Sequence, residues 1–213
     1  DDENRRVLYN SEAGVKALEF YTDWQLKHGL GDVEFFPGRA DYRDGFIAGL
    51  IGMIIDGSFA IATIRNGVGD QFAWGVTELP VFDPNDRHNF GSFWMNGLTA
   101  RAFEDPAKLE ASLKFLRFIT SEEAMKLWLE QVGELPARLS LADDPELAED
   151  PVYGPFIRSL PYSHATFFVD EEGQRRVMVD AINRVLLEGT DPATSIRIAA
   201  EEEQRILDQF WNR

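Results

Sequence analysis

A short polar and aromatic stretch, Asp56–Phe59, carries the side chains best suited to bind a ligand. It directly follows Gly52–Ile55, an apolar run that is too short for a helix and contains β-branched residues, which predicts a buried strand. Asp-Gly-Ser is typical of turns and helix N-caps, and α/β proteins bind ligands at the carboxyl ends of their strands. We therefore expect Asp56–Phe59 to contact a ligand. The alternative is that Asp56 or Ser58 only caps the following helix and Phe59 packs in the core.

A second stretch, Gly91–Thr99, interleaves small and polar residues with large aromatic ones. Adjacent side chains on a strand face opposite sides, so Phe93 and Trp94 are not both expected to point into one core. We expect one of them to line a surface or a cleft.

The sequence offers no motif typical of a catalytic or metal centre. His28, His88 and His164 are scattered, without a metal-ligand spacing such as HExxH. A Gly-rich phosphate loop and a Ser nucleophile elbow are also missing, and the lack of cysteine excludes thiol catalysis, Cys-based zinc sites and disulfides. We expect no catalytic residue, no metal site and no cofactor. The competing enzyme hypothesis is a glycosidase that uses two carboxylates.

The composition of the chain argues against some classes of binding partner. The net charge of −16 argues against nucleic acid and against an anionic membrane surface. No segment approaches the roughly 20 apolar residues of a membrane span, and the 44% of hydrophobic residues supply a sizeable core. The first residues, DDENRR, do not resemble a signal peptide, and we expect the chain to be a fragment of a longer sequence.

The elements expected around the first binding stretch are three helices and two strands. A helix is expected from an N-cap at Ser11 to about His28, and a short one from Asp41 to Ala48. After the strand and turn, a helix is expected to end at Asn66-Gly67, and Phe72–Leu79 is predicted to be a second strand.

The C-terminal half of the sequence predicts paired helices. Asp105-Pro106 starts one with a buried stripe, and Thr120 with Glu123 predicts a capping box for the next, which ends at Gly133. Apolar stripes predict two closing helices, formed by Val177, Ala181, Ile182, Val185 and Leu186 and by Ile196, Ala199, Ala200, Ile206, Leu207 and Phe210. In the helix that starts at Asp105-Pro106, the stripe expected to be buried consists of Leu109, Leu113 and Leu116.

Four segments in this order resemble the C-terminal half of bacterial extracellular solute-binding proteins of ABC importers, the maltose-binding-protein-like group. They are Asn10-Ser11 with ALEFY at 17–21, Phe46–Phe59 (FIAGLIGMIIDGSF), Lys108–Arg138 (KLEASLKFLRFITSEEAMKLWLEQVGELPAR), and Val185–Gly189 followed by 193–206. The chain departs from the family at Leu50, where a lysine is usual. It also has Gln174-Arg175-Arg176 where some members carry a further stacking aromatic residue.

The resemblance implies an α/β, periplasmic-binding-protein-like fold of two lobes (type II), of which this chain holds a helix-rich C-terminal half. Residues 1–82 and 138–213 would form the C-terminal lobe, and residues 90–132 would belong to the other lobe. The crossings between lobes would be residues 83–89 and 133–137. Ligand would bind in the cleft between the lobes, which closes by a hinge motion.

Sugar recognition uses flat aromatic faces against the C–H patches of a ring, with carboxylate, amide or guanidinium groups for the hydroxyls. The predicted turns and crossings supply both kinds of group. For Glu134 and Arg138 an inter-helix salt bridge is the alternative. The expected ligand-binding residues are Asp56, Gly57, Ser58, Phe59, Phe93, Trp94, Asn96, Glu134 and Arg138.

Together with the resemblance, these residues predict a monomeric, non-enzymatic component of an ABC importer that delivers a carbohydrate to permease subunits. A glycerol-phosphate-like or other anionic solute, with Arg138 as its partner, is the alternative ligand. The expected location is periplasmic or extracellular, held near the membrane by the transporter or by a lipid anchor on a preceding segment.

Overall fold

The computed structural model describes residues 3, 5–30, 42–142 and 144–212. Contacts within the chain divide it into two compact units. Unit 1 comprises residues 1–37 and 167–213, and unit 2 comprises residues 38–166. Two segments distant in sequence therefore build unit 1, whereas unit 2 is continuous.

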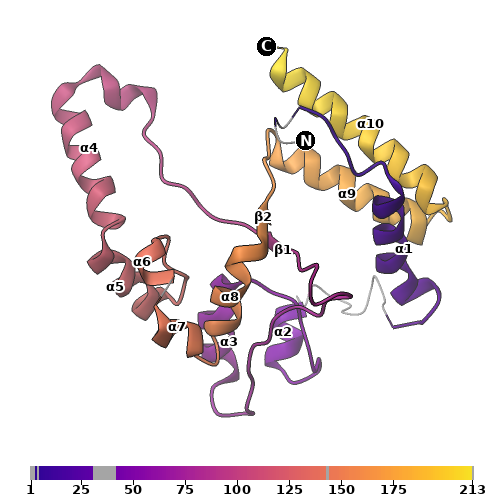
Figure 1. The fold of residues 1–213 in the computed structure, drawn as a ribbon, viewed down its shortest axis with the longest axis horizontal. Coiled ribbons are helices and arrows are strands. Elements are labelled where there is room, and N and C mark those ends of the chain that lie inside the picture. Colours follow the sequence, from indigo (N-terminus) through magenta and orange to yellow (C-terminus); the bar gives the residue numbers. More distant parts are fainter. Residues whose placement is uncertain (1–2, 4, 31–41, 143, 213) are drawn as a thin grey trace. The chain divides into compact units, whose positions relative to one another are not determined.

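Unit 1 is helical, and its helices pack against one another (Figure 1). Each begins at a side-chain cap: Ser11, Asp170 and Asp191 accept hydrogen bonds from backbone N–H groups one turn ahead. Pro192 occupies the first turn of the last helix, where its missing N–H costs nothing. The helices are α1 (Glu12–Leu26), α9 (Glu171–Leu186) and α10 (Pro192–Trp211).

The core of unit 1 is built from the predicted apolar stripes of these helices. One of its buried polar groups, the Ser195 hydroxyl, donates to the Ala181 carbonyl at 2.8 Å. Half-buried Tyr9 packs beside the core and donates to Glu203 at 2.8 Å. The buried apolar residues of this core include Leu18, Val177, Ala181, Val185, Ile196 and Ala199.

The described residues of unit 2 form helices of 3 to 14 residues and one parallel pair of short strands. The strands β1 (Asn89–Gly91) and β2 (Ser163–Ala165) pair with Phe90 opposite His164. The helical elements are α2 (Tyr42–Ile47), η1 (Ser58–Ala60), α3 (Ile61–Val68), η2 (Ala100–Glu104), α4 (Pro106–Ile119), α5 (Glu122–Val132), α6 (Leu139–Ala142), α7 (Pro145–Glu149), α8 (Gly154–Ser159) and η3 (Leu160–Tyr162).

The core of unit 2 lies around α3, directly behind the predicted binding stretch. Ala60, Ile64 and Val68 are buried there. Helix α3 runs one residue beyond the predicted end and stops at Gly69, whose φ of 52° favours glycine. Side chains from α2 and from the flanking loops complete this cluster: Phe46, Ile47, Ile54, Phe72 and Trp74.

Both predictions of a strand around this core are wrong. Neither Gly52–Ile55 nor Phe72–Leu79 is a strand, and Met53 and Ile55 are exposed. A strand needs a neighbour to bond its N–H and C=O groups. Within the described residues the only strand pairing is that of β1 with β2, so these apolar runs have no strand to join.

Two local predictions around α4 and α5 also need correction. Ser121, not Thr120, caps α5 by accepting from the Ala124 N–H, while the Thr120 hydroxyl bonds back to the Leu116 carbonyl. The α4 stripe of Leu109, Leu113 and Leu116 is not buried, nor is any other residue of α4 or α5. The other predicted helix signals agree with the structure, including the left-handed Gly133 at the end of α5. Asp41, the expected start of α2, lies outside the described residues.

Candidate functional site

The predicted stretch Asp56–Phe59 forms the turn that leads into α3. Gly57 precedes the 3₁₀ turn η1 with extended dihedral angles, and η1 continues directly into α3. A side chain at Gly57 would collide with the Phe59 ring, so glycine lets this ring fold back over the turn. The Phe59 side chain is 58% exposed. Its ring is therefore held by the local backbone without being part of the core.

An ion pair with Arg43 of α2 fixes the position of Asp56. Arg43 Nε donates to Asp56 Oδ2 at 2.7 Å and its Nη2 donates to Oδ1 at 3.2 Å, while the Gly57 N–H also donates to Oδ1 at 2.8 Å. The Asp56 side chain is only 8% exposed. Both carboxylate oxygens thus serve the protein itself, and such two-point pairing holds the guanidinium in one orientation.

Arg43 also links the charge pair to two aromatic rings. Its guanidinium carbon lies 5.9 Å from the centre of the Phe59 ring and 5.6 Å from that of Tyr42, within the range of cation–π attraction. Sequence reasoning missed Arg43 and Tyr42, because nothing in the spacing shows that α2 folds back to Asp56. The available signal was an Arg inside the short helix preceding an Asp-Gly-Ser turn.

The second aromatic group lies on an irregular segment after β1. Phe93, Trp94 and Asn96 are exposed, and Trp94 is 89% so. The expectation that Trp94 lies on a strand is wrong, because β1 already ends at Gly91. In the described part of the chain Trp94 makes no ring contact with Phe59, whose ring lies beside Arg43.

The predicted polar residues beyond α5 are engaged locally. Glu134 accepts a hydrogen bond from the Trp128 indole at 2.8 Å, and Arg138 donates to the Thr120 carbonyl at 2.7 Å. The salt bridge considered from the sequence is therefore replaced by two contacts to neighbouring groups. These contacts orient both side chains on the segment that follows Gly133.

A polar network that the sequence did not reveal joins the loop before β1 to α8 and η3. The Glu78 carboxylate accepts from Arg87, from Arg158 Nε at 2.8 Å and from the Tyr162 hydroxyl at 3.0 Å. Hydrogen bonds from Arg87, then from Arg158, lower the pKa of Glu78 to about 2. The Arg87 guanidinium also lies 4.3 Å from the centre of the Tyr162 ring. This network ties the predicted crossing at residues 83–89 to the rest of unit 2.

The described residues contain neither a metal cluster of three or more protein ligands nor a membrane-spanning helix. No group of three or more His, Cys, Asp or Glu side chains there could hold a metal ion, and no helix there is long and apolar enough to cross a membrane. The surface hollow at the end of α1 and the one beside α7 contain none of the predicted ligand-binding residues.

Residues 1–155 match the model of a family described as bacterial extracellular solute-binding proteins. The chain belongs to this family. Its members are binding proteins and not enzymes, as the sequence analysis predicted. No curated protein sequence matches significantly.

Solved structures with this fold are similar along nearly the whole chain. The sugar-binding protein MalE of Xanthomonas citri has a TM-score of 0.75 at 20% identity, covering 98% of this chain and 52% of that one. A solute-binding protein of Thermotoga lettingae bound with α-D-tagatose has a TM-score of 0.72 at 24% identity, covering 97% and 52%. UgpB of Mycobacterium tuberculosis with glycerophosphocholine has a TM-score of 0.70 at 20% identity, covering 94% and 50%.

These similarities confirm the predicted fold class. The chain has a helix-rich, periplasmic-binding-protein-like fold and spans about half the length of the solved proteins it matches. Its membership of an extracellular family agrees with the predicted location outside the cytoplasm.

Proposed function

We propose that the chain is the C-terminal half of the substrate-binding component of an ABC importer that captures a carbohydrate and delivers it to permease subunits. The observation that carries this proposal is the exposed Phe59 ring at the start of η1, backed by the Arg43–Asp56 pair. An aromatic face beside a fixed guanidinium matches the C–H patches and hydroxyls of a sugar. Family membership supports the binding role.

In this proposal Asp56 acts through Arg43. Its oxygens are occupied by Arg43 and by the Gly57 N–H, so it positions the guanidinium while Ser58 and Phe59 face the solute. Phe93, Trp94 and Asn96 supply a second face, and Glu134 and Arg138 border it. Solute then binds between two walls that approach when the protein closes.

We assign residues 1–82 and 138–213 to one lobe and residues 90–132 to the other. The open apolar face of α4 and α5 supports this assignment, because such a face is stable only when another part of the protein covers it. In the intact protein the remainder of the second lobe is the expected cover. We expect a monomer, with the permease as its protein partner.

A glycerol phosphodiester or similar anion is the second candidate ligand. The observation in its favour is the Arg43 guanidinium beside Phe59, since an arginine binds phosphate oxygens at two points. The similar UgpB structure contains glycerophosphocholine. Strong weakening of binding by salt would distinguish this ligand class from an uncharged sugar.

Calorimetric titration of the intact protein tests both candidates, with a panel of mono- to tetrasaccharides, glycerol 3-phosphate and glycerophosphocholine. We expect a saccharide to bind, and Phe59→Ala and Trp94→Ala each to weaken binding by more than about 1 kcal/mol, as interface aromatics do. Melting temperatures should change little because both rings are exposed.

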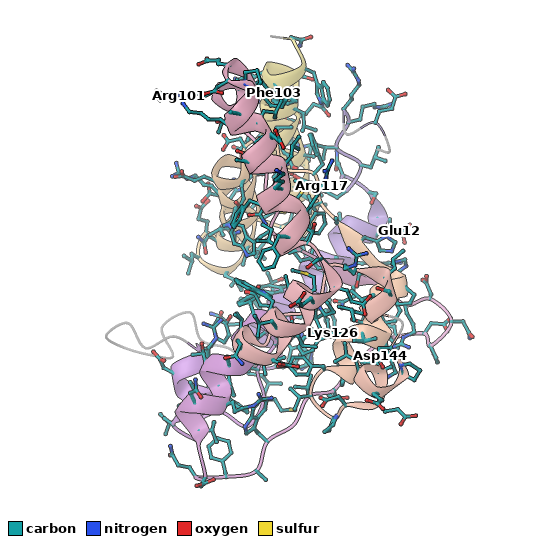
Figure 2. All side chains as sticks on the ribbon, turned by 90° about the vertical axis from the view of Figure 1, so that its left-hand side faces the viewer. Glu12, Arg101, Phe103, Arg117, Lys126 and Asp144 are labelled. Atoms are coloured by element: carbon teal, nitrogen blue, oxygen red, sulfur yellow. The ribbon has the colours of Figure 1, made fainter. Side chains whose placement is uncertain are left out.

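Phe103→Ala is the matched control, since Phe103 is an exposed phenylalanine that stands out from η2 (Figure 2). It should leave affinity unchanged. Wild-type affinity in both Phe59→Ala and Trp94→Ala, combined with much earlier melting, would show that these are structural residues and would overturn the site. Binding of glycerophosphocholine alone would replace the carbohydrate by the anionic ligand.

A further inference from the structure

Two of the three histidines, far apart in the sequence, meet where β1 begins. His88 immediately precedes β1, and His164 lies in β2 opposite Phe90. His88 Nδ1 and His164 Nε2 are 3.1 Å apart although 76 positions separate the residues. The two ring centres are 5.2 Å apart with the planes tilted by 37°. The parallel pairing of β1 with β2 therefore sets this arrangement.

Asp86 determines the tautomer of His88, and thereby which of its ring nitrogens carries a lone pair. Its Oδ1 lies 2.9 Å from His88 Nε2. A carboxylate is only an acceptor, so it assigns the proton of neutral His88 to Nε2. His88 Nδ1 then presents a lone pair towards His164. A carboxylate that orients the far nitrogen of an imidazole is also the usual support of a metal-bound histidine.

We infer that His88 Nδ1 and His164 Nε2 bind a divalent transition-metal ion. With tetrahedral angles and metal–nitrogen bonds of 2.0–2.1 Å, two imidazole nitrogens are about 3.3 Å apart and their ring centres about 5.2 Å apart. The observed distances of 3.1 and 5.2 Å are close to these. Proton exchange with solvent converts neutral His164 to its Nδ1–H tautomer, which frees Nε2, and a small opening of the two nitrogens then admits the ion.

The surroundings favour an exchangeable ion with imidazole preference. The His88 side chain is 65% exposed, so water completes the coordination and solvent supplies the ion. Imidazole nitrogens select Zn²⁺, Ni²⁺ or Cu²⁺ over Mg²⁺ and Ca²⁺. The neighbouring Arg87 shares the Glu78 carboxylate with Arg158, and the Asp86 carboxylate beside His88 balances the remaining positive charge of these groups.

A metal ion at this position joins the segment before β1 to β2. This is a cross-link between parts of the chain that are held together otherwise by the three-residue strand pairing and by the Glu78 network. Bound metal should therefore stabilise the folded protein, by an amount that grows with the logarithm of the free metal concentration above its Kd. This inference does not depend on the identity of the transported solute.

Zinc titration of the intact protein without a histidine tag, followed by calorimetry, tests the inference. We expect one Zn²⁺ to bind per chain, and His88→Ala and His164→Ala each to lower the affinity at least about tenfold. Asp86→Asn should lower it about tenfold through its effect on His88. ZnCl₂ should raise the melting temperature of the wild type, and EDTA should reverse this rise.

His28→Ala is the matched control, because His28 lies after α1 in unit 1 and should leave zinc affinity unchanged. Circular dichroism checks that each variant is folded. As a measurement that needs no variant, zinc should shift the imidazole NMR signals of His88 and His164 but not that of His28. Wild-type zinc affinity in the His88→Ala, His164→Ala double variant, or no shift of these two signals, would overturn the inference.

Discussion

The closing helices α9 and α10 of unit 1 and the helices α4 and α5 of unit 2 carry similar apolar stripes but have opposite surroundings. In α9 and α10 most of the stripe is buried against the partner helix and α1, although Phe210 near the end of α10 is 36% exposed, contrary to the prediction. In α4 and α5 no residue is buried, and Leu113, Phe115, Phe118, Leu127 and Trp128 are exposed. An apolar stripe predicts that a helix will be covered, but it does not say which segment covers it.

Polar contacts show the same contrast. In unit 1 the Tyr9 hydroxyl donates to Glu203, which also accepts from Gln174 at 2.8 Å. Burial, followed by the hydrogen bond to Glu203, raises the pKa of Tyr9. In unit 2 the Glu78 network lies nearer to solvent, with Arg158 about half exposed. The Tyr9–Glu203–Gln174 group of unit 1 thus lies beside a buried core, whereas the Glu78 network of unit 2 is partly open to solvent.

The largest effect is expected in the core of unit 1. Leu207 of α10 is 5% exposed, so Leu207→Ala should lower the free energy of unfolding by roughly 2–5 kcal/mol, the range for emptied core sites. Urea denaturation of the intact protein measures it. Leu187→Ala, at an exposed leucine just after α9, should cost no more than about 0.5 kcal/mol. Equal costs for the two variants would contradict the burial of α10.

Leu127→Ala tests whether another part of the intact protein covers α5. The Leu127 side chain is 56% exposed in this chain. If the other lobe packs against it, the substitution in the intact protein should cost about 2 kcal/mol. A cost near that of the exposed Leu187 would show that the α4–α5 face remains in solvent, and the lobe assignment of residues 90–132 would lose its support.

Glu78→Gln should reveal the acid sensitivity of unit 2. The folded pKa of about 2 lies below the ordinary value of 4.5, so the network contributes its full stability above about pH 4.5. This contribution is lost as the pH falls towards 2. At neutral pH the variant should be less stable by roughly 1–2 kcal/mol, a figure reduced for solvent screening. Denaturation at several pH values should show this difference shrinking on acidification, and a constant difference would contradict the network.

The smallest expected effect concerns the cap of α5. Ser121→Ala removes the oxygen that accepts from the Ala124 N–H and should cost about 1 kcal/mol. Thr120→Ala should cost less, because the Thr120 hydroxyl only bonds back to the Leu116 carbonyl within α4. Chemical denaturation of both variants compares them directly. A larger loss for Thr120→Ala would restore the cap position predicted from the sequence.

Much of the fold was predictable from local signals. Ser11, Asp105 and Asp191 are helix caps because their side-chain oxygens satisfy N–H groups only a few residues ahead. Gly133 ends α5 because its left-handed conformation is cheap for glycine alone. The four motifs in order also indicated the solute-binding family, which the comparison confirmed.

The two predicted strands failed for a reason that no local pattern contains. The runs at Gly52–Ile55 and Phe72–Leu79 have strand composition, but a strand is defined by hydrogen bonds to a neighbour, and none pairs with them among the described residues. Their apolar side chains still contribute, since Ile54, Phe72 and Trp74 pack around α3.

The sequence by itself determined most of the helix caps and ends and the family, because each depends on residue type and short spacing. Only the tertiary structure decided which distant groups meet. It paired Asp56 with Arg43, joined Glu78 to Arg158, and placed His88 against His164. The spacing of these residues in the sequence does not predict their contacts, because the path of the backbone between them determines which residues meet.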